Sequence, residues 1–318
     1  MKQGLFIFLL LCFSFVSQAQ KGVQYEIVVA QDGSGDFETI QNAIDATKAF
    51  PDKRITIYIK NGFYREKVRI PSWNTSLSLI GEDVEKTIIS FDDYFDKINR
   101  GRNSTFFTYT LLVEADDFYA ENLTIENSAG PVGQAVALHV EGNRCAFKNC
   151  RILGNQDTLY STGEKSSQLF TNCRIEGTTD FIFGSSTAVF SQCTIVSKKD
   201  SYITAASTNE GKEFGFVFID CDLKAADGVN KVYLGRPWRP YAKTVFMECN
   251  LGAHIAPEGW KEWSNAENKS TTFYAEYKNT GAGANVSKRV SWSHQLADKE
   301  VQKFSMVNIL GNWVLEYQ

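Results

Sequence analysis

Three polar side chains are candidates for chemistry because they recur at a fixed interval. Gln134, Asp157 and Asp180 are separated by equal steps, since 157 − 134 = 23 and 180 − 157 = 23. If 23 residues make one coil of a solenoid, we expect these residues to stack in a column, about 4.8 Å apart. Two carboxylates at that separation do not both ionise easily, so we expect one to hold a proton at neutral pH. A proton donor beside a carboxylate is suited to acid–base or nucleophilic catalysis.

Other residues near this column favour a catalytic interpretation over a purely structural polar ladder at a solenoid corner. Gln156 places a second amide beside the middle carboxylate. Arg236 follows Asp180 by 56 residues (236 − 180 = 56), which equals two coils of 28. We therefore expect its guanidinium near Asp180, where it would keep that carboxylate ionised and oriented. Trp238, on the same segment, is a candidate stacking surface for a sugar ring.

The elements that must position these residues form a repeat of short strand-like segments. Six segments align without gaps: FYAENLTI, AFKNCRI, LFTNCRI, VFSQCTI, VFIDCDL and VFMECNL. Their aligned core position is occupied by Leu123, Cys150, Cys173, Cys193, Cys221 and Cys249. Alternation with aliphatic and aromatic residues predicts that these side chains point inward, where cysteine packs as a small hydrophobic residue. No helical pattern separates the strands, so we predict an all-β fold, a single-stranded right-handed parallel β-helix.

The stacking also predicts the state of the cysteines. Side chains one coil apart are about 4.8 Å apart, whereas the Cβ atoms of a disulfide are about 3.8 Å apart. We therefore expect the five cysteines of the aligned position to be reduced, although secretion would permit disulfides.

The flanking segments are expected to close the solenoid. Residues 37–50 have helical spacing with Thr39 at the capping position, which predicts a short N-terminal capping helix. Residues 92–108 form a charged, irregular excursion that we expect to lie over one face. After Gly252 the repeat fades, and we expect the remaining chain, including a helical segment at 298–310, to wrap back across the solenoid. No linker rich in Pro or Ser interrupts the chain, so we expect one domain.

Residues 1–19 have the pattern of a secretory signal peptide, with a positive Lys2, an apolar run and a small-residue cleavage site. The run is too short to span a bilayer as a helix. We therefore expect a mature domain at 20–318 that is secreted or periplasmic, has no membrane anchor and is monomeric. Removing Lys2 takes the formal net charge from −4 to −5. A mildly acidic chain is a poor candidate for nucleic-acid binding, which needs a basic surface.

Several common catalytic motifs are absent from the sequence. There is no G-x-S-x-G elbow and no H-E-x-x-H motif. The 3 histidines leave little material for a Ser-His-Asp triad, and the cysteines match no zinc spacing. The paired carboxylates and amides are the chemistry that remains.

These residues lie in segments that resemble the pectin methylesterases, carbohydrate esterases built on a β-helix. GFYRE at 62–66 is similar to the family's G-x-Y-x-E segment. Four further segments resemble its active-site segments, in the same order: QAVAL at 134–138, QDTL at 156–159, DFIFG at 180–184 and LGRPW at 234–238. Residues 28–46, 259–263 and 276–284 resemble flanking signatures, so the resemblance covers nearly the whole mature chain.

The resemblance implies hydrolysis of the C6 methyl esters of galacturonate units in pectin, releasing methanol and pectate. By it, Asp180 is the nucleophile, Asp157 the general acid and then base, and Arg236 holds Asp180. Gln134 and Gln156 would form the oxyanion hole. The sugar subsites would be lined by Tyr160, Phe183 and Trp238. The resemblance implies no metal and no cofactor, and methyl-esterified homogalacturonan as the partner.

Two other functions remain open from the residues alone. A pectate lyase or a polygalacturonase-like enzyme could use the same fold, because paired carboxylates about 5 Å apart also suit a retaining glycosidase. Paired amides favour an esterase, since they stabilise a carbonyl oxyanion. The third alternative is a non-catalytic polysaccharide-binding solenoid, which would need the aromatic residues without an acid–base pair.

Overall fold

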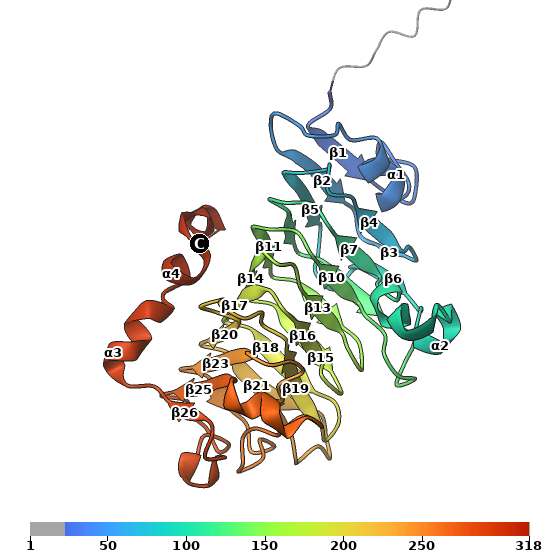
Figure 1. Ribbon diagram of the computed structural model, residues 1–318. Coiled ribbons are helices and arrows are strands. Elements are labelled where there is room, and N and C mark those ends of the chain that lie inside the picture. The colour runs from blue at the N-terminus through green and yellow to red at the C-terminus, as the bar shows by residue number, and fades with distance from the viewer. Residues whose placement is uncertain (1–22, 318) are drawn as a thin grey trace, which may run out of the picture.

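The computed structural model describes residues 23–317, and the predicted signal peptide at 1–19 lies outside that range. Three parallel sheets run along the molecule, and successive coils add a strand to each (Figure 1). Every pairing between named strands in the described chain is parallel, as in Ile57 opposite Leu79. The predicted parallel β-helix is confirmed. The strands are short, three to five residues in most cases, because the chain turns a corner after each one.

The three sheets differ in the number of strands that they contain. The eleven-stranded sheet contains β1 (Glu26–Val29), β2 (Ile55–Ile59), β5 (Leu77–Gly81), β8 (Tyr119–Glu121), β11 (Cys145–Lys148), β14 (Ser167–Thr171), β17 (Thr187–Ser191), β20 (Phe216–Ile219), β23 (Lys243–Met247), β25 (Phe273–Tyr277) and β26 (His294–Gln295). The seven-stranded sheet contains β4 (Val68–Ile70), β7 (Leu111–Val113), β10 (Leu138–Val140), β13 (Leu159–Ser161), β16 (Ile182–Gly184), β19 (Tyr202–Ala206) and β22 (Tyr233–Gly235). The eight-stranded sheet contains β3 (Gly62–Tyr64), β6 (Thr87–Phe91), β9 (Thr124–Asn127), β12 (Arg151–Leu153), β15 (Arg174–Gly177), β18 (Thr194–Ser197), β21 (Asp222–Ala225) and β24 (Asn250–Leu251).

Identical side chains stack along the core, as the aligned repeat predicts. Five phenylalanine rings lie one above another with centroids 4.3 to 5.0 Å apart and planes within 9° of parallel: Phe147, Phe170, Phe190, Phe218 and Phe246. The five cysteines of the aligned position are buried beside them, and all six cysteines of the described chain are free. The prediction of inward, reduced cysteines is confirmed.

The N-terminal end of the core is closed by α1 (Ile40–Asp45), which is shorter than the predicted 37–50. Thr39 caps it, accepting a hydrogen bond from the Asn42 amide. The Glu66 carboxylate accepts two more backbone N–H groups of the first turn, at 2.9 and 3.0 Å. The last residue of GFYRE therefore holds the capping helix in place, because helix N-termini leave N–H groups unsatisfied.

The C-terminal part differs from expectation in two respects. Residues 273–277 form β25, another strand of the eleven-stranded sheet, so the solenoid continues beyond the point where the sequence repeat fades. The expected helix at 298–310 is broken into α3 (Asp298–Val301), the 3-10 turn η4 (Gln302–Phe304) and α4 (Met306–Leu310). Ser305 is extended (ψ 148°) and caps α4, which ends one helix and starts the next.

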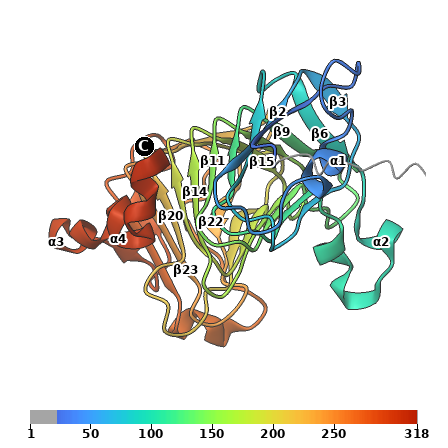
Figure 2. The same ribbon diagram turned by 90° about the horizontal axis from the view of Figure 1, so that it is seen from above.

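This tail does run back along the solenoid, as predicted (Figures 1 and 2). Phe304, Ile309, Leu310 and the buried Val314 of the last turn η5 (Asn312–Tyr317) pack in one cluster with outward-facing residues of the eleven-stranded sheet. The tail covers an apolar sheet face that would otherwise be exposed to water. The other short 3-10 segments are η2 (Ala266–Ser270) and η3 (Val286–Lys288).

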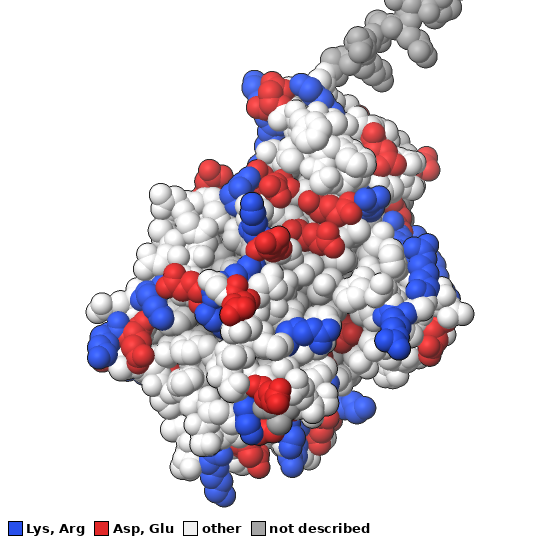
Figure 3. Space-filling model, in the orientation of Figure 1, with Lys and Arg blue, Asp and Glu red and all other residues white. Residues whose placement is uncertain are grey.

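The excursion at 92–108 leaves the solenoid between β6 and β7. It contains two short helical segments, α2 (Phe95–Ile98) and the 3-10 segment η1 (Gly101–Phe107). Figure 2 shows this segment projecting from the side of the coil stack. Figure 3 shows Lys and Arg side chains near the edge where α2 lies. Within residues 23–317, no helix is long and apolar enough to cross a membrane.

Candidate active site

A cleft of about 480 Å³ lies where the excursion meets the seven-stranded sheet. Its walls come from three parts of the chain: the excursion, the residues around the starts of β13 and β16, and the segment after β22. The lining residues are Phe95, Arg102, Asn103, Thr105, Phe106, Gln134, Gln156, Asp157, Asp180, Phe183, Ala205, Arg236, Trp238, Arg239 and Trp263.

Asp157 and Asp180 occupy equivalent places on successive coils. Leu159 pairs with Ile182, a step of 23 residues, so the two aspartates, each two residues earlier, are in register. Both have positive φ, 64° and 50°, the left-handed conformation that Asp adopts more readily than most residues. The residue after each, Thr158 or Phe181, is fully buried. The core thus anchors the backbone while the two carboxyl groups face the cleft.

Gln134 is not in register with this pair, and the prediction of a three-residue column is wrong in that respect. Gln134 bridges to Gln156, a step of 22, and Leu138 pairs with Leu159, a step of 21. The equal 23-residue spacing counted the corner residues between coils, whose number differs from coil to coil. The outcome is a pair of glutamines one coil apart next to a pair of aspartates one coil apart.

Arg236 forms a two-pronged ion pair with Asp180. Its Nε donates to Asp180 Oδ1 at 2.9 Å and its Nη2 to Oδ2 at 2.6 Å. The guanidinium carbon lies 4.0 Å from the ring centroids of both Tyr202 and Trp263. Two hydrogen bonds and two aromatic rings therefore fix the guanidinium in one orientation.

The path from Asp180 to Arg236 is not two coils of 28, as the spacing suggested. Ile182 pairs with Thr204, a step of 22, and Thr204 with Gly235, a step of 31. Gly235 permits this close pairing, because a Cβ atom there would lie 1.9 Å from Thr204 Oγ1. The long side chain of Arg236 then covers the remaining distance back to Asp180.

The electrostatic environment separates the two carboxyl groups. Burial, and next the charge of Asp180, raise the pKa of Asp157 well above its ordinary value, although Arg236 acts in the opposite direction. Burial also raises the pKa of Asp180, but the Arg236 hydrogen bonds and charge act against it. Arg236 touches Asp180 directly, so Asp180 is the one that ionises first. At neutral pH the geometry favours a protonated Asp157 beside an ionised Asp180.

The side chains of Gln134 and Gln156 both line this cleft. Within the described chain, neither carboxamide has a hydrogen-bond partner, and both side chains are half-buried. Two amide groups that face a cleft in this way are available to a bound molecule.

Aromatic rings extend from the aspartates along the seven-stranded sheet. Phe183 and Trp238 line the cleft with ring centroids 5.9 Å apart in an edge-to-face arrangement. Tyr160 is in register with Phe183 and stacks on it at 4.6 Å, but lies outside the cleft lining. Its other face lies 5.0 Å from Phe106 of the excursion. Tyr160 thus continues the aromatic row beyond the cleft.

Several cleft residues were not among the predicted site residues. Trp263 lies in the 259–263 segment, so a signal for it was present in the sequence. Phe106 and Arg102 come from the excursion, whose irregular sequence gave no indication of what it would face. Arg239 lies just after Trp238, with its guanidinium 4.7 Å above that ring. Within residues 23–317, no group of three or more His, Cys, Asp or Glu side chains is arranged to hold a metal ion.

Comparison with known proteins agrees with this architecture. A family model described as Pectinesterase matches residues 26–312. Pectinesterase 31 of Arabidopsis thaliana is 40% identical over 284 residues, covering 87% of this chain and 89% of the relative. A probable pectinesterase/pectinesterase inhibitor of the same plant is 41% identical over 301 residues, and the chain spans only 53% of its length.

Two solved structures have the same fold. Pectin methylesterase from carrot has a TM-score of 0.86 and 33% identity, over 94% of this chain and 97% of that one. Pectin methylesterase PemA from Erwinia chrysanthemi has a TM-score of 0.79 and 31% identity, over 92% and 98%. With the family model spanning nearly all of the described residues, this chain belongs to the pectinesterase family.

Proposed function

We propose that this chain hydrolyses the methyl esters of pectin, with Asp180 as the nucleophile and Asp157 as the general acid and then base. The observation that carries the proposal is the Arg236 ion pair. It keeps Asp180 ionised and aimed, while burial keeps the proton on Asp157 one coil away. A nucleophile and a proton donor, side by side, are what ester cleavage requires.

In the first half of the reaction, an Asp180 carboxylate oxygen attacks the ester carbonyl carbon. The carbonyl oxygen becomes an oxyanion, which accepts hydrogen bonds from the side-chain amides of Gln134 and Gln156. As the tetrahedral intermediate collapses, the bond from carbon to the methoxy oxygen breaks. Asp157 gives its proton to that oxygen, and methanol leaves. The substrate acyl group is then bound to Asp180 as an anhydride.

In the second half, ionised Asp157 takes a proton from a water molecule whose oxygen attacks the acyl carbon. The bond to Asp180 breaks, and Asp180 becomes a carboxylate again. The product is a carboxylic acid that ionises in solvent, and Asp157 is again protonated. One ester and one water have become one acid and one methanol.

The substrate contacts follow from the same cleft. Phe183 and Trp238 would stack against the sugar rings, and Tyr160 would support Phe183 and extend this surface. Arg102 and Arg239 line the cleft, and within the described residues neither has an acidic partner. Because the chain as a whole is acidic, these guanidinium groups supply the local positive charge that a polyanion such as pectin needs.

The setting of the protein is part of the proposal. We infer a mature domain at 20–318 that is released after a signal peptide at 1–19 and acts, as a monomer, in the periplasm or outside the cell. Its partner there would be methyl-esterified homogalacturonan. No membrane anchor, nucleic acid, metal or cofactor takes part in the proposed reaction.

The test is to follow three products on methylated pectin. An esterase releases methanol without new reducing ends, a glycosidase releases reducing ends, and a lyase forms unsaturated ends. We expect methanol alone from the wild-type chain, and no methanol from a folded Asp180→Asn variant. Reducing or unsaturated ends without methanol would refute an esterase. A folded Asp180→Asn variant with wild-type methanol release would refute the nucleophile assignment.

A further inference from the structure

The segment that carries Gln134 has little support of its own. It follows β9 as an irregular stretch with two glycines at positive φ, Gly130 at 84° and Gly133 at 112°. A Cβ atom added at either glycine would have no neighbour within 4 Å, so the backbone there is not packed against anything. Val132, between them, is 44% exposed. The position of Gln134 must therefore be fixed from its C-terminal side and from outside the segment.

The outside support comes from the two ends of the 92–108 excursion. The Phe95 N–H donates to the Gln134 carbonyl at 2.9 Å. At the other end, Thr108 Oγ1 accepts a hydrogen bond from the Val136 N–H, also at 2.9 Å. Both ends of the excursion are thus bonded to the backbone of residues 134–136. Movement of the excursion would move the Gln134 amide.

Asn127 joins these three pieces at one buried point. Its side-chain nitrogen lies 2.8 Å from the Asp93 carbonyl, 3.2 Å from the Thr108 carbonyl and 3.0 Å from the Val136 carbonyl. Only 3% of the residue is exposed. One NH2 group therefore links the start of the excursion, its end and the Gln134 segment.

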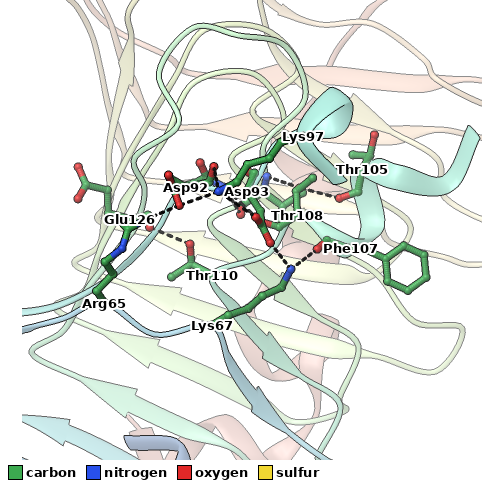
Figure 4. A network of polar contacts seen from close by, with 12 residues as sticks. Arg65, Lys67, Asp92, Asp93, Lys97, Thr105, Phe107, Thr108, Thr110 and Glu126 are labelled. Carbon is green, nitrogen blue, oxygen red and sulfur yellow. Dashed lines mark hydrogen bonds and ion pairs between the residues drawn. The ribbon is translucent and has the colours of Figure 1, made fainter. Parts of the chain in front are cut away.

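Lys67 fixes the excursion from the solenoid side (Figure 4). Its ammonium lies 2.6 Å from the Asp93 carboxylate and 2.5 Å from the Phe107 carbonyl, so one cation binds both ends of the excursion. It also lies 4.8 Å from the centroid of the Tyr109 ring. Lys97 contacts the other oxygen of Asp93 at 3.2 Å. The Lys67–Asp93 pair is 27% and 14% exposed, so solvent screens it less than the chain's surface pairs.

We propose that Lys67 and Asn127 are positioning residues that hold the amide of Gln134 at the oxyanion through the 92–108 excursion. Gln156 does not depend on them, because the solenoid coils hold it: Asn155 and Asp157, on either side, bond to residues 178 and 179 of the next coil. Neither Lys67 nor Asn127 lines the cleft. The proposal rests on the proposed function, since it needs an oxyanion for Gln134 to stabilise.

The test is a double-mutant cycle on methanol release, with kcat measured per mole of folded protein. Lys67→Met removes the charge and keeps the chain length. Misplacing one oxyanion donor without deleting it should lower kcat by about 10-fold or more, with KM changed much less. In a Gln134→Ala background the same change should lower kcat by less than about 3-fold, because the donor is already absent. In a Gln156→Ala background the full loss should persist. Lys67→Arg, which keeps the cation, should recover most of the activity.

The matched control is Lys60→Met, which removes an exposed ion pair with Glu82 at 3.0 Å elsewhere on the solenoid. It should leave kcat unchanged. Asn127→Asp, which puts an acceptor among three carbonyls, provides a second variant with the same expected coupling to Gln134. A merely structural role would lower the melting temperature and the folded yield but leave kcat per folded molecule unchanged.

Two results would overturn the proposal. One is an unchanged kcat in folded Lys67→Met. The other is a loss of equal size in the wild-type and Gln134→Ala backgrounds. A wild-type chain that releases no methanol would instead refute the proposed function, so the two failures are distinguishable.

Discussion

Replacing Arg236 by lysine should separate the orientation of the nucleophile from its charge. Lysine keeps one positive charge but offers no planar fork, so at most one of the two bonds to Asp180, at 2.9 and 2.6 Å, survives. A hydrogen bond to a charged group contributes about 1.5–3 kcal/mol, and each 1.4 kcal/mol changes a rate about tenfold. The ion pair is 23% and 8% exposed, so little of this is lost to solvent screening. We expect kcat to fall roughly 10- to 150-fold.

The same substitution should shift the pH profile. Arg236 lowers the pKa of Asp180 against the effect of burial, so weakening that contact raises the Asp180 pKa. Because attack requires the ionised carboxylate, the acidic limb of the kcat profile should move to higher pH. The apparent pKa values belong to the coupled Asp157–Asp180 pair. The assay is methanol release from methylated pectin, measured across pH.

The chain offers a matched control for this prediction. Arg144 also grips an aspartate with two bonds, Nε to Asp117 Oδ1 at 2.6 Å and Nη2 to Oδ2 at 2.7 Å, but outside the cleft. Arg144→Lys should alter stability slightly and leave the pH profile unchanged. If Arg236→Lys keeps wild-type kcat and an unshifted acidic limb, the idea that the guanidinium fork orients Asp180 is wrong.

Four further outcomes are expected. Asp157→Asn and Asp180→Asn should each leave at most residual methanol release, and the double variant should be little worse than either, because the two act as a unit; a double variant much worse than both would indicate independent roles. Gln156→Ala should weaken transition-state binding by about 2.7–4 kcal/mol, seen mainly in kcat; a change confined to KM would argue against an oxyanion contact. The KM for partly de-esterified pectin should rise with ionic strength, and Arg102→Gln with Arg239→Gln should flatten that dependence; equal salt slopes would exclude these groups as polyanion contacts. Thiol titration of the denatured protein should find at least five free groups; two or fewer would contradict the stacked cysteines.

The sequence by itself determined the fold and the residue types of the site. A strand-like repeat with an inward cysteine can be satisfied only by stacking equivalent positions, and Cys150 to Cys249 are buried in that order. The 23-residue step between Asp157 and Asp180 is the true coil length at that point, so their pairing was predictable. The family segments then named the remaining polar residues.

Only the tertiary structure decided the register and the far wall of the cleft. Gln134 pairs with Gln156 because the corner between those two coils is shorter, and the spacing of polar residues does not reveal corner lengths. Arg236 reaches Asp180 across coils of 22 and 31 residues, which happen to add to nearly the expected sum. The excursion has no periodicity from which its partners could be read. Its place over the cleft is fixed by Lys67 and Asn127, which lie far from it in sequence and meet it only when the coils stack.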